Sequence, residues 1–416
     1  MNENKIIVSI ICLAYNHEQY IRQCIEGFIT QKTNFAFEVI IHKGIARWKL
    51  NNPFENWLSY KADKSEFWKC IYVLYYQIFD YKYYNVGLHF INKQLEIHKA
   101  KWKGVSRSYV IRDMVYSLHR FGADFQDYWS YDFLSKSPIG KERWITDKLR
   151  YGYDDILSSS EVISLVSDKY KCYCEFKEYY KRDALGCYTN EDYTDFVEFV
   201  KKHPSFIYKP LCAFSGKGIK KITLSENLIQ DFFNASIRTG SFIVEEIIEQ
   251  HKDFEYIHPQ SINTIRVTTF TLNNRVEILA TSLRMGVGNS IADNAGNGGI
   301  FSSIDPQSGI IVCPASNYIG GKYIKHPDTN VVIPGIKIPS WDELKSTIKE
   351  VASKLNNKYN EATLISWDFA YSTKGWIIVE VYTGGGWRIL QAPQKEPLKE
   401  QLYKLIDEWT NYNEKR

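Results

Sequence analysis

The spacing of apolar positions changes several times along the chain, and each change predicts a different kind of element. Residues 6–14 form a continuous apolar, β-branched run, which is typical of a buried parallel strand. Residues 17–32 carry apolar side chains at helical spacing behind Asn16, a good helix cap, and residues 37–41 form a second apolar run. We therefore expect a strand–helix–strand unit at the start of the chain.

Residues 45–165 are rich in aromatic side chains and predict a mainly helical region. Residues 67–79 are apolar nearly all round, which favours a buried helix over a membrane-surface helix, because the nearby lysines do not gather on one polar face. From Ser205 onward, short β-rich runs alternate with helices. One helix is predicted to start at a capping box of Ser340 and Glu343, followed by the buried stripe Leu344, Ile348, Val351 and Leu355.

The composition indicates a folded protein without a nucleic-acid partner. Hydrophobic residues make up 44% of the 416 positions, and Lys and Arg exceed Asp and Glu by only 52 to 48, with the basic residues spread along the chain. The 8 cysteines are scattered, which favours a reducing compartment over a disulfide framework. No run reaches the roughly 18 apolar residues of a membrane span. We therefore expect a soluble, cytoplasmic protein with no membrane span.

A small-residue loop joins two strand-like runs near the middle of the chain. Residues 206–210 and 219–222 predict a strand and a return strand, and the loop between them ends in Ser215, Gly216, Lys217 and Gly218. The backbone N–H groups of such a loop can fold over phosphate oxygens, and Lys209 on the first strand would add a positive charge. Taken alone, the same pattern also fits an ordinary surface turn.

Two carboxylates are predicted to face each other across a hairpin. Residues 364–371 and 376–382 are strand-like runs with a short connection. A hairpin centred on Lys374 places Asp368 opposite Glu380. Opposed like charges destabilise a sheet, and Mg²⁺ would resolve that conflict because it takes carboxylate oxygens together with substrate phosphates. The alternative is a solvent-facing strand with lysines nearby.

Arginines and a glycine-rich loop complete the candidate chemistry. Arg266 and Arg284 lie on strand-like runs, and their forked donors suit phosphate or carboxylate oxygens, although structural salt bridges are the alternative. The polar loop that follows is suited to gripping a small substrate, although it also fits an ordinary turn. The candidate substrate-contacting residues are Asn263, Asp293, Asn294, Gly298 and Gly299.

In this order the runs resemble the ATP-grasp superfamily, specifically its sugar-transfer-associated branch, over roughly residues 110–395. The resembling runs are SDKYKCYCEFKEYYKRD, FIYKPLCAFSGKGIKKI, FIVEEIIEQH, PQSINTIRVTTF, LRMGVGNSIADNAGNGGI and SWDFAYSTKGWIIVEV. The resemblance implies an α+β fold with two subdomains that enclose ATP, preceded by a helical region. The expected division is a short N-terminal segment (1–44), the helical region (45–165), a small lid subdomain (166–245) and a large metal and substrate subdomain (246–416).

The resemblance also implies roles for individual residues. Lys169 and Lys209 would contact ATP phosphates under the loop 215–218, and Arg266 and Arg284 would stabilise the transferring phosphoryl group. The hinge that holds adenine and ribose would be Glu245, Glu246, Ile247 and Ile248, and the Mg²⁺ ligands would be Asp368 and Glu380. One position departs from the family's Glu-x-Asn metal motif. Glu380-Val381 is followed by Tyr382 in place of the asparagine, and a neutral phenol is a poor Mg²⁺ ligand.

Residues 5–43 are similar to the opening of family 2 glycosyltransferases, whose first strand and loop hold the nucleotide of a sugar donor. After residue 43 the sequence lacks the acidic segment and the Asp-x-Asp site of that family. We therefore interpret these residues as a truncated remnant; the alternative is a small docking or nucleotide site.

The favoured function is an ATP-dependent carboxylate–amine ligase that acts through an acyl-phosphate. By analogy with the branch name, it would join an amino acid to a sugar-linked carboxylate or amine in cell-surface polysaccharide synthesis, beside glycosyltransferases of the same pathway. Two alternatives remain: a non-catalytic ATP-binding partner in a polysaccharide assembly, and a glycosyltransferase.

Overall fold

The computed structural model describes residues 8–14, 37–43, 53–79, 81–211, 218–290, 293–359 and 361–414. Near the N-terminus, β1 (Val8–Ala14) and β2 (Phe37–Lys43) pair in parallel, with Val8 opposite Phe37. The two strands expected in this part of the chain are confirmed, whereas the helix expected over 17–32 lies outside the described residues.

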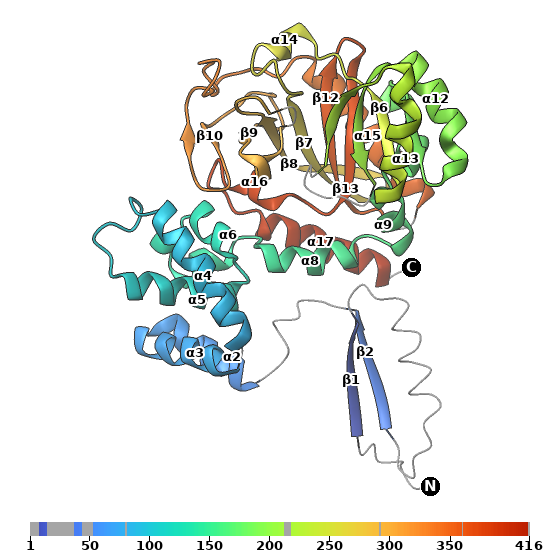
Figure 1. Ribbon diagram of the computed structural model, residues 1–416. Coiled ribbons are helices and arrows are strands. Elements are labelled where there is room, and N and C mark those ends of the chain that lie inside the picture. The colour runs from blue at the N-terminus through green and yellow to red at the C-terminus, as the bar shows by residue number, and fades with distance from the viewer. Residues whose placement is uncertain are drawn as a thin grey trace, which may run out of the picture.

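A helical region follows these strands (Figure 1). It contains α2 (Pro53–Lys64), α3 (Glu66–Phe79), α4 (Tyr81–Ile97), α5 (Arg107–Phe121), α6 (Phe125–Ser130), η1 (Phe133–Ser135), α7 (Pro138–Glu142) and α8 (Asp147–Ile156). Local sequence sets some of the helix ends. Gly122 ends α5 with a φ of 69°, and the Ser137 side chain accepts a hydrogen bond from the Gly140 N–H at the start of α7.

The helix α3 is buried on one side only, which corrects the expectation of a buried helix. Tyr72 and Val73 are buried, but Phe67, Leu74 and Ile78 on the opposite face are 67%, 53% and 64% exposed. A helix that is apolar all round does not reveal which side the rest of the chain covers. Within the described residues, none of the helices combines the length and the hydropathy needed to cross a bilayer.

The smaller of the two sheets within residues 184–383 is antiparallel. It contains β3 (Ala184–Cys187), β4 (Ser205–Pro210), β5 (Lys220–Thr223) and β6 (Phe242–Glu246), in the order β3-β6-β4-β5. Two helices, α12 (Tyr193–Lys202) and α13 (Ile229–Thr239), pack against it through the buried aromatic residues Phe196, Phe206, Phe233 and Phe242. The other elements of this part are α9 (Ser160–Ser167), α10 (Lys169–Glu175), α11 (Lys177–Tyr180), η2 (Asn190–Asp192) and η3 (Glu226–Leu228).

The larger sheet has 7 strands among the described residues, in the order β11-β10-β9-β8-β7-β12-β13. These are β7 (Thr264–Leu272), β8 (Arg275–Met285), β9 (Ile300–Ile304), β10 (Ala315–Ser316), β11 (Lys322–Tyr323), β12 (Leu364–Ser372) and β13 (Gly375–Thr383). The accompanying helices are α14 (Lys252–Glu255), η4 (Ala295–Asn297), α15 (Trp341–Lys358), α16 (Trp387–Gln391) and α17 (Lys399–Glu414).

The helix α15 packs against β7 and β8 through the expected stripe, because Leu344, Ile348, Val351 and Leu355 are all buried. The expected capping box at its start is wrong. Ser340 has a left-handed backbone with a φ of 46°, and its side chain makes no cap hydrogen bond. Its hydroxyl instead lies 3.3 Å from the Tyr371 hydroxyl, so the left-handed turn directs it away from the first N–H groups of the helix.

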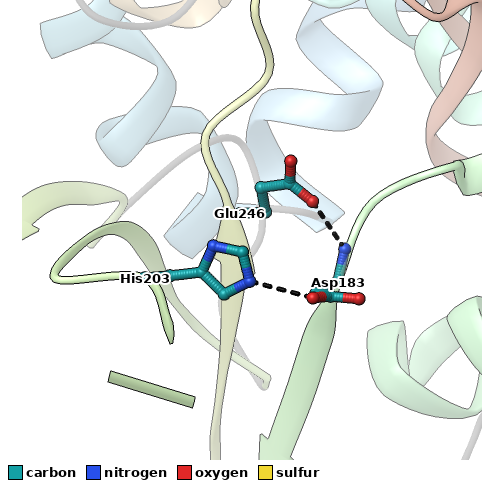
Figure 2. Close-up of side chains that lie close together, drawn as sticks. All are labelled: Asp183, His203 and Glu246. Carbon is teal, nitrogen blue, oxygen red and sulfur yellow. Dashed lines mark hydrogen bonds and ion pairs between the residues drawn. The ribbon is translucent and has the colours of Figure 1, made fainter. Parts of the chain in front are cut away.

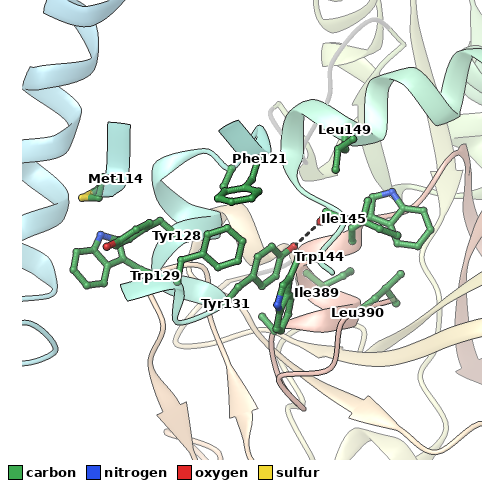
Figure 3. Packing of buried hydrophobic residues seen from close by; sticks show 14 of the residues in the cluster. Met114, Phe121, Tyr128, Trp129, Tyr131, Trp144, Ile145, Leu149, Ile389 and Leu390 are labelled. Atoms are coloured by element: carbon green, nitrogen blue, oxygen red, sulfur yellow. Dashed lines mark hydrogen bonds between the residues drawn. The ribbon is translucent and has the colours of Figure 1, made fainter. Parts of the chain in front are cut away.

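The helical region and the larger sheet share one hydrophobic core. Figure 3 shows Trp144, Ile145 and Leu149 of the helical region beside Ile389 and Leu390 of α16. The same cluster of buried side chains continues into β7, β8 and β9. The core therefore crosses the domain boundary expected at residue 165, and the boundaries expected at residues 44, 165 and 245 stay predictions.

Candidate active site

The candidate site is a cavity of about 1350 Å³ that is lined by both sheets and by α8 and α16. A pocket for one small molecule typically measures roughly 300–1,000 Å³, so this cavity has room for more than one ligand. The expected site residues that line it are Lys209, Glu245, Ile247, Ile248, Arg266, Arg284, Asp293, Asn294, Asp368 and Glu380.

Arg266, Asp368 and Glu380 form a row across three neighbouring strands of the larger sheet. In register, Asp368 on β12 pairs with Arg266 on β7 and with Glu380 on β13. Directly paired residues point to the same face of a sheet, so all three side chains face the cavity. The expected opposition of Asp368 and Glu380 is confirmed.

The register arises from a β-bulge, and not from the expected hairpin centre. The β12–β13 hairpin turns at Thr373 and Lys374, with Ser372 opposite Gly375, and one extra residue, Val379, then shifts the pairing. In a regular register without the bulge, Val379 would pair with Asp368, and Glu380 would pair with Trp367 and point to the other face of the sheet. The bulge therefore brings the second carboxylate into the cavity.

Asp368 is a buried carboxylate held by two arginines. It is 1% exposed, Arg266 donates to it through Nε and Nη2, and Arg284 donates through Nη1 at 2.9 Å. Burial by itself raises the pKa of this carboxyl, but the two guanidinium groups outweigh burial and hold its pKa below the usual range. Arg284 also binds Asp293 at 2.9 Å, so the two arginines and two carboxylates form one network.

Glu380 has a different environment from Asp368. The Lys169 ammonium lies 3.3 Å from its Oε1, and the Tyr382 hydroxyl donates to its Oε2. The Tyr382 ring lies under the Arg266 guanidinium, with 4.7 Å between the guanidinium carbon and the ring centroid. Burial and the neighbouring carboxylates raise the pKa of Tyr382 well above its usual value, so it is a neutral donor to Glu380.

On the smaller sheet, Lys209 and Glu245 form a buried ion pair beside the cavity, with 2.8 Å between Nζ and Oε1. The second oxygen of Glu245 accepts hydrogen bonds from Arg182 at 2.7 and 3.0 Å. Burial raises the pKa of Glu245, but the charges of Arg182 and Lys209 outweigh burial and lower it to about 2. Glu245 is thus an ionised partner that holds Lys209 in place.

Glu246 lies outside the cavity lining, in the cluster of Figure 2. The Asp183 N–H donates to Glu246 at 3.0 Å, and the His203 ring nitrogen lies 2.9 Å from the Asp183 carboxylate. These residues have the types and spacing of metal ligands. However, Lys202 reaches Asp183 at 2.5 Å and Lys374 reaches Glu246 at 2.9 Å. Two ammonium groups balance two carboxylates, so we interpret the cluster as an ion-pair network.

The glycine-rich segments contribute mainly backbone geometry in the described residues. Ser215, Gly216 and Lys217 lie outside those residues. Gly218 has a φ of 81°, and a Cβ there would lie 2.9 Å from the Pro210 ring. Gly298 also has a positive φ, of 93°, and a Cβ on Gly299 would lie 2.7 Å from the Asp293 carbonyl oxygen. Gly298 and Gly299 allow the backbone of their loop to pass close to Asp293. Neither these two glycines nor Gly218 lines the cavity.

Asn263 also lies away from the cavity lining. It is fully buried, and its side-chain amide donates to the carbonyl oxygens of Phe254 and His258 at 3.0 and 3.3 Å. The amide therefore ties the loop before β7 together. The cavity is not lined by Asn263, Gly298 or Gly299, so it does not support the substrate contacts expected of these residues.

Sequence reasoning missed several residues that line the cavity. Lys221 pairs with Ile207 across β4 and β5, and period-two alternation through 219–222 would have placed it on this face. Arg150 and Tyr318 line the cavity from distant parts of the chain, and no motif marks them. Gly386 leaves room for a guanidinium, because a Cβ there would lie 2.7 Å from Arg266 Nη1.

Comparisons with solved structures show similarity to several ligases at low sequence identity. D-alanyl-alanine synthetase A from Vibrio cholerae is 14% identical over 59% of this chain and 64% of its own, with a TM-score of 0.37. D-alanine–D-alanine ligase from Helicobacter pylori is 13% identical over 59% and 61%, with a TM-score of 0.36. The ATP-grasp ligase PsnB, complexed with a minimal precursor, is 10% identical over 74% and 75%, with a TM-score of 0.36.

The chain thus spans less than two thirds of the length of each of the two D-alanine enzymes. No curated protein sequence matches it. A family model described as sugar-transfer associated ATP-grasp matches residues 150–407, which is more than half of the chain. The match covers the smaller and the larger sheet and α8 from Arg150 onward, and it confirms the expected α+β ATP-grasp fold. It does not cover residues 5–43, whose similarity to glycosyltransferases stays a prediction. The chain belongs to the sugar-transfer associated ATP-grasp family.

Proposed function

We propose that the protein is an ATP-dependent carboxylate–amine ligase that acts through an acyl-phosphate. The observation that carries this proposal is that Lys169, Lys209 and Glu380, from three separate elements, surround one small space beside the Arg266–Asp368 pair. The site is dense in charged groups and shows no nucleophile triad among its described residues. Such a site suits phosphoryl transfer, where positioning and charge neutralisation dominate catalysis.

In the proposed reaction, a carboxylate oxygen of one substrate attacks the γ-phosphorus of ATP, and ADP leaves. The amine of a second substrate then attacks the acyl carbon, phosphate leaves, and the amine proton passes to solvent. Lys169 and Lys209 hold the ATP phosphates. Arg266 and Arg284 offset the negative charge that develops on the transferring phosphoryl group, because their guanidinium groups are fixed before the reaction starts.

The donor set of the row fits a magnesium ion. Asp368 and Glu380 face each other across the hairpin, and carboxylate oxygens are the ligands that Mg²⁺ prefers together with substrate phosphates. These two residues would hold the ion, which would neutralise phosphate charge when bound. Tyr382 gives Glu380 a hydrogen bond and offers no anionic oxygen of its own. The residues therefore fit one ion better than two.

The proposed substrates are an amino acid and a sugar-linked carboxylate or amine used in cell-surface polysaccharide synthesis. The family description and the size of the cavity support this choice. The same description suggests an enzyme that works beside glycosyltransferases of the pathway. The scattered cysteines favour the reducing cytoplasm as its compartment.

ADP release from Mg-ATP tests the proposal. The full-length protein is incubated with panels of amino acids and uronic-acid sugars, and we expect one pair to stimulate ADP release. Glu380→Gln should lower that rate about 100-fold, since it removes an anionic ligand of the Mg²⁺ that would neutralise the phosphate charge. Glu277→Gln is the matched control, because that exposed carboxylate on β8 lies outside the cavity lining and its loss should leave the rate unchanged. Sugar transfer from a UDP-sugar without ATP would overturn the proposal.

A second candidate function is a non-catalytic ATP-binding partner in a polysaccharide assembly. The observation in its favour is Tyr382, which occupies the expected metal position and engages Glu380. Such a protein would bind Mg-ATP but release no ADP with any substrate pair.

A further inference from the structure

Arg182 lies just before β3 and is absent from the cavity lining, yet it contacts both sheets. It is 5% exposed, and its guanidinium carbon lies 4.8 Å from the Tyr180 ring centroid. Arg182 lies near the end of the run 167–183 that resembles the family, but neither that resemblance nor the cavity lining assigns it a role.

Every N–H group of the Arg182 guanidinium has an acceptor. Nε and one N–H of Nη2 donate to Glu245 Oε2, and the other N–H of Nη2 donates to the Val379 carbonyl at 3.3 Å. Nη1 donates to the carbonyls of Ile378 at 2.6 Å and Tyr180 at 3.5 Å. A guanidinium has five such donors, and a lysine ammonium cannot reproduce this fork.

The first consequence concerns the charge available to a phosphate. Glu245 divides its two oxygens between Arg182 and Lys209. If Arg182 were absent, Lys209 would be the only cation in contact with a fully ionised, buried carboxylate. Their mutual attraction would be strong, because nearby charges interact more strongly away from water. Arg182 therefore leaves Lys209 able to turn its charge toward a second anion.

The second consequence concerns the β-bulge. Two of the three carbonyls that Arg182 binds belong to Ile378 and to Val379, the extra residue that sets Glu380 opposite Asp368. Arg182 thus supports both the lysine of the smaller sheet and the carboxylate of the larger sheet.

We propose that Arg182 is a positioning residue that sets Lys209 and Glu380 for binding of a nucleoside triphosphate or diphosphate. This inference rests on the proposed function, since it assumes that the cavity binds a nucleotide. Arg182 itself does not touch the nucleotide and acts through Glu245 and the bulge.

Calorimetric binding of Mg-ADP to the full-length protein tests this inference. Arg182→Met should weaken Mg-ADP binding about tenfold or more, because the charge of Lys209 then stays paired with Glu245. Adding Glu245→Gln to that variant should restore most of the affinity, since residue 245 then has no negative charge to attract Lys209. A purely structural role predicts no rescue, because the second substitution would only add damage. Arg238→Met, at an exposed arginine of α13, is the matched control and should bind like the wild type.

The outcomes separate the inference from the function beneath it. If the wild type binds no Mg-ADP, the proposed function fails. If the wild type binds but folded Arg182→Met binds equally well, or is not rescued by Glu245→Gln, the inference alone fails. If Arg182→Met does not fold, Arg182→Lys is the variant to test, because it keeps the charge but loses the forked donors. Arg182→Lys should weaken Mg-ADP binding, and adding Glu245→Gln to it should cause no further loss of affinity. A folded Arg182→Lys with wild-type affinity for Mg-ADP overturns the inference.

Discussion

At the scale of single residues, Tyr382 decides how many oxygens suited to a metal ion the proposed site offers. Its hydroxyl donates to Glu380 and its ring lies under Arg266, so the phenol connects the cation and the carboxylate of the row. An asparagine at this position would present a carbonyl oxygen in place of a donor hydroxyl. With tyrosine at this position, the site gains a hydrogen bond to Glu380 and lacks the oxygen that an asparagine would offer to a metal ion.

The number of bound divalent ions tests this interpretation of Tyr382. We expect the wild type to bind one Mn²⁺ per chain in the presence of ADP, and Tyr382→Asn to bind a second. Electron paramagnetic resonance titration of free Mn²⁺ measures the count. Tyr382→Phe is the control, because it removes the hydroxyl without adding a ligand and should keep the count at one. Two ions in the wild type would contradict the prediction.

Glu245 predicts a specific dependence of stability on pH. Its pKa in the folded protein is about 2, below the ordinary value of 4.5. The stabilisation is therefore fully present above the ordinary value and is lost as pH falls through the folded value. We expect Glu245→Gln to be less stable than the wild type by about 3 kcal/mol near neutral pH, with the difference shrinking toward about pH 3. Urea unfolding at several pH values measures it, and a constant difference would count against the buried ion pair.

At the scale of elements, the β12–β13 hairpin shows what the sequence could and could not reveal. The pattern predicted both strands and the pairing of Asp368 with Glu380, since alternation and a turn signal are local. It missed the bulge at Val379, because an extra residue leaves no local trace in the pattern. It also missed the exposed face of α3 and the left-handed Ser340, which depend on neighbours distant in sequence. Lys209, Arg266 and Arg284 were found because strand motifs carry them. Arg150 lies outside the resembling runs, and Arg182 lies inside one of them without a pattern that marks its role.

The helix α8 contributes one wall of the cavity, and Arg150 is its cavity-lining residue. Because α8 packs against α16 and shares a hydrophobic core with the larger sheet, we expect Arg150 to act on the co-substrate. Arg150→Ala should raise the KM for an anionic co-substrate about tenfold and leave the KM for ATP unchanged. Arg143→Ala, whose side chain is 60% exposed, is the matched control for a lost positive charge. An equal rise in both KM values would place Arg150 near the nucleotide instead.

At the scale of the whole molecule, the helical region is fastened to the larger sheet by charge as well as by the shared core. Arg388 of α16 binds both oxygens of Asp124 at 2.8 Å and reaches Asp127 at 2.9 Å. Its guanidinium carbon also lies 5.1 Å from the ring centroid of Tyr318, which lines the cavity. The helices therefore support the wall of the site and are more than an appendage to it.

Removing that guanidinium should weaken the whole unit. Arg388→Leu leaves two carboxylates without their cation, and we expect a loss of about 3–5 kcal/mol in the free energy of unfolding. Chemical denaturation measures the loss. Adding Asp124→Asn and Asp127→Asn should recover much of it, because no uncompensated buried charge then remains. A loss below about 1 kcal/mol, as for an exposed pair, would show that the helical region is held by its apolar core alone.

The carboxylates at the centre of the cavity all have cationic partners: Asp368 and Asp293 with arginines, and Glu245 and Glu380 with lysines. Under the proposed function, a phosphate chain must draw Lys169 away from Glu380 while a divalent ion takes the carboxylate oxygen that the lysine releases. Either ligand alone would leave one member of this ion pair without a partner. Metal and nucleotide are then positive heterotropic effectors of each other, coupled by the free energy of this exchange. The protein would bind the metal–nucleotide complex far more tightly than it binds the metal or the nucleotide alone.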